Sequence, residues 1–301
     1  MLILFIILPF ACTKDKMSLP AISTKPVTFI TIFSAVSGGE MSGLSPSITS
    51  KGICWSKNAN PTVFDSIAND NSENSKFYLD MKNLLPNTVY YVRAFATNST
   101  GTGYGDQISF TTLTDYSGQT GTVSDIDGNT YPSIGIGSQI WMIKNLQTTK
   151  FNDGTLIPNV TDNSAWSVLS TPAYCFYNNN LANKTAYGVL YNWYVADLFS
   201  NGNKNVCPTG WHVPTDLEYI TLTLYLDQVG KNLKESGFSG ILGGVRYDTG
   251  PFDGIELDGL FWTSTSYQSK IAQRFQLNGD YGDAFTGTSE GFGLSIRCLK
   301  N

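Results

Sequence analysis

The run Val89–Thr97 places the strongest constraint on how this chain can fold. Successive side chains of a β-strand point to opposite faces, so this run would expose one set and bury the other. The two sets are Tyr90, Val92, Ala94, Ala96 and Tyr91, Arg93, Phe95, Thr97. The turn Leu84–Thr88 places Tyr90 where a β-sandwich uses a tyrosine corner, with a buried ring and a hydroxyl that meets the backbone.

Similar strand-like runs recur at short spacing through residues 18–113, separated by segments rich in Gly, Ser, Asn and Pro. This pattern predicts a β-sandwich. The spacing Leu-x-Pro-x-Thr-x-Tyr in Leu84–Tyr90, with Gly52–Ser56 and Ala96–Gly105, resembles fibronectin type III domains over about this whole span. The resemblance implies a spacer or protein-contact module. We expect Trp55 to be part of its core and Cys54 to be buried without a partner.

The N-terminus predicts export. Residues 1–11 are continuously apolar but too few to cross a bilayer as a helix, and they end at Cys12, which a polar stretch follows. This arrangement resembles a bacterial lipoprotein signal, which implies acylation of Cys12. The alternative is a plain secretory signal cleaved nearby. We therefore expect residues 1–17 to be a signal and tether, and the protein to be held by lipid in the bacterial envelope, exposed at the outer membrane.

The polar segment 114–120 indicates a linker. Residues 121–301 carry hairpin and helix signals, unlike the short strand-like runs that precede them. Asp127-Gly128 is a strong hairpin turn signal. Asp125–Asn129 also looks like half of a calcium loop, but the bidentate glutamate that such a loop needs is absent downstream. The pattern therefore favours a turn.

Two segments of the second domain carry helix signals. Apolar side chains at helical spacing within Ala186–Phe199 predict a helix buried on one face. Thr215 and Glu218 form a capping box that predicts a second helix starting at Asp216. Its core face is expected to consist of Leu217, Ile220 and Leu224.

A set of motifs in order along residues 121–301 resembles the Fibrobacter succinogenes major paralogous domain. The motifs are DIDGNTYPSIGIGSQIWMIKNL, FNDGTLIPNV, AYCFYNNN, YGVLYNWY, CPTGWHVPTDLEY, LFWTSTS and the terminal GLSIRC. The resemblance implies a C-type-lectin-like α+β fold, with two helices on an irregular antiparallel sheet and long surface loops. It implies no reaction, because the family has no established common activity. It does imply a disulfide between Cys207 and Cys298, and leaves Cys175 unpaired and buried.

The segment 243–259 is the expected binding loop, since its carboxylates are the type of ligand that calcium prefers. These carboxylates belong to Asp248, Asp253, Glu256 and Asp258. Calcium-dependent sugar binding is thus a hypothesis, although the Glu-Pro-Asn, Gln-Pro-Asp and Trp-Asn-Asp triplets of calcium-dependent lectins are missing. Trp166, in a polar segment, is the expected exposed aromatic platform.

The single histidine, His212, precedes the capping box and is interpreted as a packing or hydrogen-bonding residue rather than a catalytic one. Two enzyme hypotheses stay open: a hydrolase using a pair of the loop carboxylates, and a formylglycine-generating activity, suggested by a similarity at Gly210–Glu218. The latter uses two cysteines near the C-terminal end, where this chain has only Cys298.

We favour a non-enzymatic module that binds a glycan or a surface protein, with a purely structural envelope component as a third hypothesis. The net charge of −5 and the lack of a basic stripe argue against nucleic acid as a partner.

Overall fold

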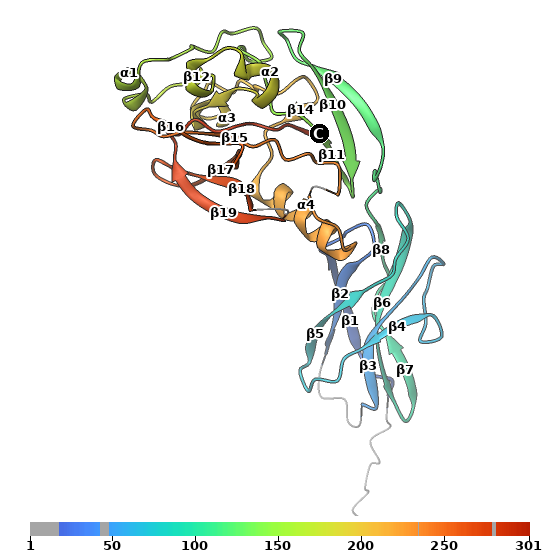
Figure 1. Cartoon of the computed structure of the whole chain (residues 1–301). Helices are drawn as coiled ribbons and strands as arrows, with labels where there is room; N and C mark the ends of the chain where they lie inside the picture. The colour runs from blue at the N-terminus through green and yellow to red at the C-terminus, as the bar shows by residue number, and fades with distance from the viewer. Residues whose placement is uncertain (1–17, 43–47, 234, 279–280) are drawn as a thin grey trace, which may run out of the picture. The chain divides into compact units, whose positions relative to one another are not determined.

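Figure 1 shows a computed structural model of the chain, which describes residues 18–42, 48–233, 235–278 and 281–301. The chain divides into two compact units between Leu113 and Thr114. The predicted signal and Cys12 lie outside the described residues. In the part that the structure covers, no helix has the length and apolar character needed to span a membrane.

The first unit is the predicted antiparallel β-sandwich. One sheet has the order β1-β2-β5; the other has the order β4-β3-β6, and β7 and β8 both pair with β6. Apolar side chains from both sheets form one core that includes Trp55. The strands are β1 (Ile22–Thr28), β2 (Ala35–Met41), β3 (Ser50–Ser56), β4 (Ser66–Asn69), β5 (Lys76–Met81), β6 (Val89–Asn98), β7 (Gly101–Tyr104) and β8 (Ile108–Thr111).

The tyrosine corner is present at the start of β6. The Tyr90 ring is buried, and its hydroxyl accepts a hydrogen bond of 3.1 Å from the backbone N–H of Leu85. The ring stacks on Phe110 of β8, with 5.9 Å between the ring centroids. The corner therefore ties the turn before β6 to the core, as the sequence predicts.

Tyr90→Phe removes this hydroxyl and keeps the ring. The variant is expected to lose about 1 kcal/mol of unfolding free energy, because the Leu85 N–H loses its acceptor. Urea unfolding followed by circular dichroism measures the loss. Tyr78→Phe is the control, since the Tyr78 side chain is exposed; equal stability of the two variants would contradict the prediction.

The second unit contains two larger antiparallel sheets. One has the order β14-β20-β11-β10-β9, and the other β17-β18-β19. The strands of these sheets are β9 (Thr120–Ser124), β10 (Thr130–Ile136), β11 (Gln139–Met142), β14 (Trp211–His212), β17 (Gly259–Gln268), β18 (Ile271–Asn278), β19 (Tyr281–Ser289) and β20 (Leu299–Lys300).

Two small two-stranded sheets and several short helices complete the second unit. One sheet pairs β12 (Tyr174–Cys175) with β13 (Leu190–Tyr191), and the other is a hairpin of β15 (Gly243–Arg246) and β16 (Phe252–Ile255). The helices are α1 (Asn163–Ser167), α2 (Asn183–Tyr187), α3 (Trp193–Ala196) and α4 (Asp216–Gln228), with a 3₁₀ turn, η1 (Tyr177–Asn179). The sequence predicts two helices in this unit, whereas the described residues form four. Helix α4 is the longest of them.

Helix α4 begins at Asp216, as predicted. Thr215 and Glu218 form both bonds of the capping box. The predicted core face is wrong, however, because Leu217 and Leu224 are exposed. The buried face carries Tyr219, Leu222 and Leu226, and Tyr219 stacks on Phe275 of β18 at 4.3 Å. Helix α4 carries apolar residues on both its buried and its exposed face, so their spacing alone does not show which face is buried.

The predicted helix over Ala186–Phe199 is wrong. Helix α2 ends at Tyr187, because Gly188 follows with φ of 83° and donates its N–H to the carbonyl of Lys184. The next apolar pair, Leu190–Tyr191, joins β12 as a strand, and α3 is one turn long. Leu190, Tyr191 and Val195 do face the core, from β13 and α3, whereas Leu198 and Phe199 are exposed.

The predicted hairpin at Asp127-Gly128 is present between β9 and β10. Asp125 accepts hydrogen bonds from the backbone N–H groups of Asp127 and Asn129 and from the Tyr131 hydroxyl. Burial alone would raise the pKa of Asp127, but hydrogen bonds from Thr149 and Lys150 lower it to about 2. These carboxylates hold the turn, so the turn interpretation is correct.

The predicted linker 114–120 is held by the second unit. Tyr116 donates its N–H to the carbonyl of Gly137, and Gly118 donates to that of Gly135. The Ser117 hydroxyl is 2.7 Å from the hydroxyl of Tyr225 on α4. Strand β9 already starts at Thr120. The polar composition of the segment therefore reflects bonding to the neighbouring turn and helix.

Cys207 and Cys298 form a disulfide, as the family resemblance implied. It ties the segment before α4 to the segment before β20. Cys54 and Cys175 are buried free thiols, as predicted. Burial raises the pKa of Cys54 to about 11 and that of Cys175 to about 12.

Candidate functional site

The β15–β16 hairpin carries most of the carboxylates expected to bind a ligand, and it lies beside the β17-β18-β19 sheet (Figure 1). Its two strands pair in the register Val245↔Asp253 and Arg246↔Phe252. Gly244 has φ of 68°, and a Cβ there would lie 2.7 Å from the carbonyl oxygen of Asp253. Only glycine fits that position without strain, so the hairpin depends on this residue.

Arg246 anchors the β15–β16 hairpin to the 160–163 segment. Its side chain is fully buried. The guanidinium donates to the carbonyls of Gly250, Val160 and Thr161 at 2.9, 2.6 and 3.0 Å, and to Asn163 Oδ1 at 3.0 Å. It also lies between two aromatic rings, 4.3 Å from the Trp166 centroid and 5.0 Å from that of Phe252. The hairpin and the 160–163 segment are therefore joined by one cation.

Trp166 is not the exposed platform that the sequence predicts. Its side chain is 1% exposed, and its indole N–H donates to the carbonyl of Gly291 at 2.9 Å. The polar segment around it folds as α1, which Asp162 caps by accepting from the N–H of Ala165. The polar residues occupy the outer side of this helix, and Trp166 turns inward onto Arg246.

The four predicted loop carboxylates are separated by their local partners. Asp253 accepts a 3.2 Å hydrogen bond from the Tyr247 hydroxyl, and Glu256 accepts one from the Tyr187 hydroxyl. These bonds raise the pKa of both tyrosines. Asp253 and Glu256 are exposed, and Asp248 and Asp258 are partly buried.

The expected calcium loop is therefore not preassembled. Among the residues that the structure describes, no three His, Cys, Asp or Glu side chains are grouped as a metal ion would need. Calcium needs six to eight oxygen ligands, and the carboxylates are spread over the hairpin turn, strand β16 and the segment that follows it. What the hairpin offers instead is two tyrosine–carboxylate pairs at its surface.

Arg274 lies close to this surface but was not predicted to contribute to it. It is on the central strand β18, between Trp262 of β17 and Thr286 of β19. Burial lowers its pKa, and the charge of Asp258 acts against that shift. A lone arginine in a strand gives no signal in the sequence, because the pattern does not show what faces it.

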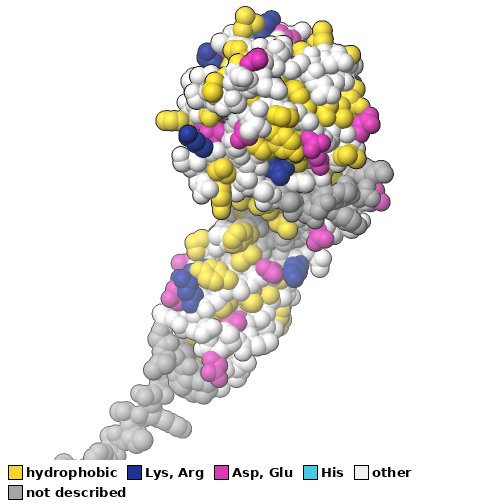
Figure 2. All heavy atoms as spheres, turned by 60° about the vertical axis from the view of Figure 1, so that its left-hand side comes forward, with side chains coloured by type: hydrophobic (Ala, Val, Ile, Leu, Met, Phe, Trp, Pro, Cys, Tyr) yellow, Lys and Arg dark blue, Asp and Glu magenta, His cyan; other side chains and the backbone are white. Residues whose placement is uncertain are grey.

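Figure 2 brings forward the side of the second unit on which β16 and β19 lie in Figure 1. Hydrophobic side chains gather there among acidic and basic ones. Tyr247 contributes to such a group, because its ring meets Phe292 edge-on at 5.5 Å. Such mixed apolar and polar surfaces are typical of small-molecule and interaction sites.

His212 bridges Glu218 and Asn301. Its Nε2 lies 2.9 Å from Glu218 Oε1 and its Nδ1 2.7 Å from Asn301 Oδ1. The other oxygen of Glu218 accepts from the N–H and hydroxyl of Thr215. A small pocket of about 200 Å³ lies beside the ring, lined also by Trp211 and Lys204. The carboxylate beside His212 is thus engaged in capping α4.

Stability is expected to fall as pH rises above neutrality. The hydrogen bond to Glu218 raises the pKa of His212 from its ordinary 6.5, while burial opposes this shift. The bridge therefore stabilises fully below pH 6.5 and is lost as pH rises through the folded-state pKa. Burial alone would raise the pKa of Glu218, but hydrogen bonds from His212 and Thr215 lower it. The folding stability that Glu218 contributes is accordingly lost only in acid, as pH falls below its ordinary pKa of 4.5.

Melting temperatures across about pH 5 to 9 measure this dependence. The chain has a single histidine, so His212→Gln should flatten the profile above neutrality. An unchanged slope in the variant would contradict the assignment.

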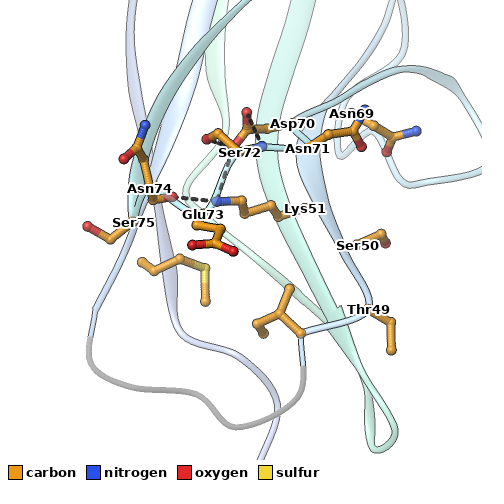
Figure 3. A pocket seen from close by; sticks show the side chains of 12 residues that line it. Thr49, Ser50, Lys51, Asn69, Asp70, Asn71, Ser72, Glu73, Asn74 and Ser75 are labelled. Atoms are coloured by element: carbon orange, nitrogen blue, oxygen red, sulfur yellow. Dashed lines mark hydrogen bonds and ion pairs between the residues drawn. The ribbon is translucent and has the colours of Figure 1, made fainter.

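A larger pocket, of about 610 Å³, opens in the first unit between the start of β3 and the segment 69–75 (Figure 3). Lys51 forms an ion pair with Asp70 at 3.0 Å, and its amine also donates to the carbonyl of Asn74. Burial alone would raise the pKa of Asp70, but hydrogen bonds from Lys51 and Ser72 lower it. Lys51 and Asp70 thus satisfy one another, and we place the candidate site on the hairpin.

Comparison with known protein families identifies the second unit. Residues 134–300 match the model of the Fibrobacter succinogenes major domain. The chain belongs to this family. The Fibrobacter succinogenes major domain here includes the hairpin, Arg274, His212 and both disulfide cysteines. None of the curated proteins matches the chain.

Solved structures similar to this chain correspond to about a third of it. One is the sensor domain of the anti-sigma factor RsgI4 of Pseudobacteroides cellulosolvens, with 20% identity and a TM-score of 0.26 over 33% of this chain and 99% of that one. Another is a fibronectin type III domain of human fibronectin type III domain containing protein 3, with 21% identity and a TM-score of 0.26 over 36% and 99%. We draw no argument from likeness at this level; the sandwich assignment rests on the strand pairing and the tyrosine corner.

Proposed function

We propose that this protein is a non-enzymatic binding protein of the bacterial envelope whose second unit binds glycans at the β15–β16 hairpin. The two surface tyrosine–carboxylate pairs carry this proposal. Tyr247 with Asp253, and Tyr187 with Glu256, place oriented polar groups beside aromatic rings. Sugar rings have polar hydroxyl edges and apolar C–H faces, and such a surface complements both.

The rigidity of the hairpin supports this proposal. Arg246 fixes the strand that precedes Tyr247, and the Gly244 conformation fixes the strand pairing around Asp253. Binding groups held by buried partners lose little conformational entropy when a ligand arrives. The hairpin surface is therefore suited to recognition.

A C-type-lectin-like fold for the second unit is part of the proposal. In such folds a disulfide commonly joins the segment near the second helix to the last strand. The Cys207–Cys298 bond, which ties the segment before α4 to the segment before β20, supports this assignment.

The bonds formed by the potentially reactive side chains support the non-enzymatic assignment. Cys298 is in a disulfide, whereas the formylglycine-generating hypothesis needs two reactive cysteines near the C-terminal end. His212 and Glu218 serve the helix cap. Asp253 and Glu256 each accept from a tyrosine, which is an arrangement for holding a surface rather than for sharing a proton.

The proposed location is the outer membrane, with the protein held by acylated Cys12 and exposed at the cell surface. Mass spectrometry of the mature protein from its native envelope is expected to find diacylglyceryl-cysteine at position 12. An unmodified N-terminus at another residue would contradict lipid anchoring without affecting glycan binding.

An array of glycans probed with the purified full chain tests binding. We expect retention on a subset of glycans, and an affinity about tenfold weaker for Tyr247→Phe, which keeps the ring and loses the hydroxyl beside Asp253. Tyr78→Phe in the first unit is the matched control. Retention on immobilised proteins but on no glycan would overturn the glycan proposal in favour of a protein partner.

A further inference from the structure

Arg274 is an arginine without a hydrogen-bonding partner. Its Nε and Nη1 are buried and contact no acceptor in the described part of the chain. The two other arginines of the core differ: Arg246 makes four hydrogen bonds, and Arg297 donates to Phe238, Ser239 and Asn145 and leaves its Nε unpaired. A buried donor that has lost water and gained no acceptor destabilises the fold. The free-energy cost of leaving these two donors unpaired therefore calls for a role of Arg274 other than stabilising the fold.

The position of Arg274 gives one. Its side chain is on the same face of β18 as Ala272, which packs in the core with Trp262, and is opposite to Phe275, which packs on α4. Trp262, the cross-strand partner of Arg274, belongs to the same apolar cluster as Val245 of β15. Arg274 is therefore on the face of the sheet against which the hairpin packs.

Asp258 is the complementary group. It lies at the end of the hairpin, where its backbone N–H donates to the carbonyl of Gly254 and its own carbonyl accepts from Gly244. Within the described residues its carboxylate accepts no hydrogen bond and forms no ion pair with Arg274. Asp258 directly precedes β17, whose Trp262 pairs with Arg274, and the charge of Asp258 acts on the pKa of Arg274. An unpaired donor and an unpaired acceptor therefore belong to neighbouring strands of one sheet without forming an ion pair.

We infer that Arg274 and Asp258 together bind the vicinal diol of a neutral sugar without a metal ion, at the site of the proposed function, on which this inference rests. Adjacent hydroxyls accept from a guanidinium and donate to a carboxylate at once. The acidic neighbours Asp253 and Glu256 disfavour a ligand carboxylate. The Tyr247 ring, edge-on to Phe292, offers the apolar contact that the C–H face of a sugar requires.

The test uses the full chain on an array that carries neutral hexose oligosaccharides beside matched uronate oligosaccharides, in calcium and in EDTA. Neutral oligosaccharides are expected to bind equally in both buffers. Arg274→Lys keeps the charge but loses the planar fork, and Asp258→Asn loses the acceptor charge; each should weaken binding at least about tenfold. Arg93→Lys, in the first unit, is the matched control.

The outcomes separate this inference from the proposed function. Binding of neutral glycans that Arg274→Lys and Asp258→Asn leave unchanged overturns the inference alone, as does binding restricted to uronates or abolished by EDTA. Retention of no glycan overturns both.

Arg274→Met gives a readout independent of the ligand. If the arginine is kept for binding, its removal leaves no acceptor unpaired, and the melting temperature should equal or exceed that of the wild type. A large fall in melting temperature would make Arg274 a structural residue and overturn the inference.

Discussion

Arg246→Met is expected to lower the unfolding free energy of the second unit by about 3–5 kcal/mol. The methionine fills part of the space between Trp166 and Phe252, but three carbonyls and one amide oxygen lose their donor. Each buried acceptor left unpaired costs about 1–3 kcal/mol, and the gain from no longer burying a charge offsets only part of the total.

Urea unfolding followed by tryptophan fluorescence measures this effect, because five of the six tryptophans lie after residue 114. Arg274→Met is the matched control, with the same chemical change at a guanidinium that makes no hydrogen bond. The two variants should differ in stability by several kcal/mol. Equal destabilisation would show that the hydrogen bonds of Arg246 contribute nothing beyond the volume of the side chain.

Removal of the Cys207–Cys298 disulfide is the second large effect. The bond joins positions 91 residues apart, and closing a loop of this length stabilises the folded state by about 4–5 kcal/mol in the chain-entropy model. The double alanine variant should therefore unfold at much lower urea concentration. The N-terminal sandwich contains neither cysteine and should keep its own transition.

Cys175→Ala is the control for the disulfide variant. Cys175 is buried in the same unit and unpaired, so this change removes only packing. Dithiothreitol gives a second check, because reduction should reproduce the loss in the wild type and leave the double variant unaffected. A wild-type protein whose unfolding midpoint does not change on reduction would contradict the prediction.

Local signals in the sequence were sufficient where the contacts are local or pairwise. The capping box joins Thr215 to Glu218, and the tyrosine corner joins Leu85 to Tyr90. The family resemblance supplied the Cys207–Cys298 pair, which spacing alone does not fix. The capping box and the tyrosine corner are each carried by a short motif that appears in the sequence as a unit.

The site depended on contacts that no local pattern contains. Arg246 meets Val160 across 86 residues, and this contact turns Trp166 from an exposed platform into a core side chain. The helix predicted over Ala186–Phe199 failed for the same reason, because pairing of Leu190–Tyr191 with β12 outweighed the helical spacing. The sequence pattern did not identify Arg274, because what distinguishes it is that its Nε and Nη1 have no hydrogen-bond acceptor among the described residues.

The two free thiols have a consequence for how the protein fares in an oxidising compartment. A thiol reacts as its thiolate, and burial keeps Cys54 and Cys175 protonated at neutral pH. Wrong pairings therefore have to form before these side chains are enclosed, during folding itself. Once the native structure closes around Cys54 and Cys175, peroxides and foreign disulfides find no exposed thiol within the described residues, and the Cys207–Cys298 crosslink is left undisturbed.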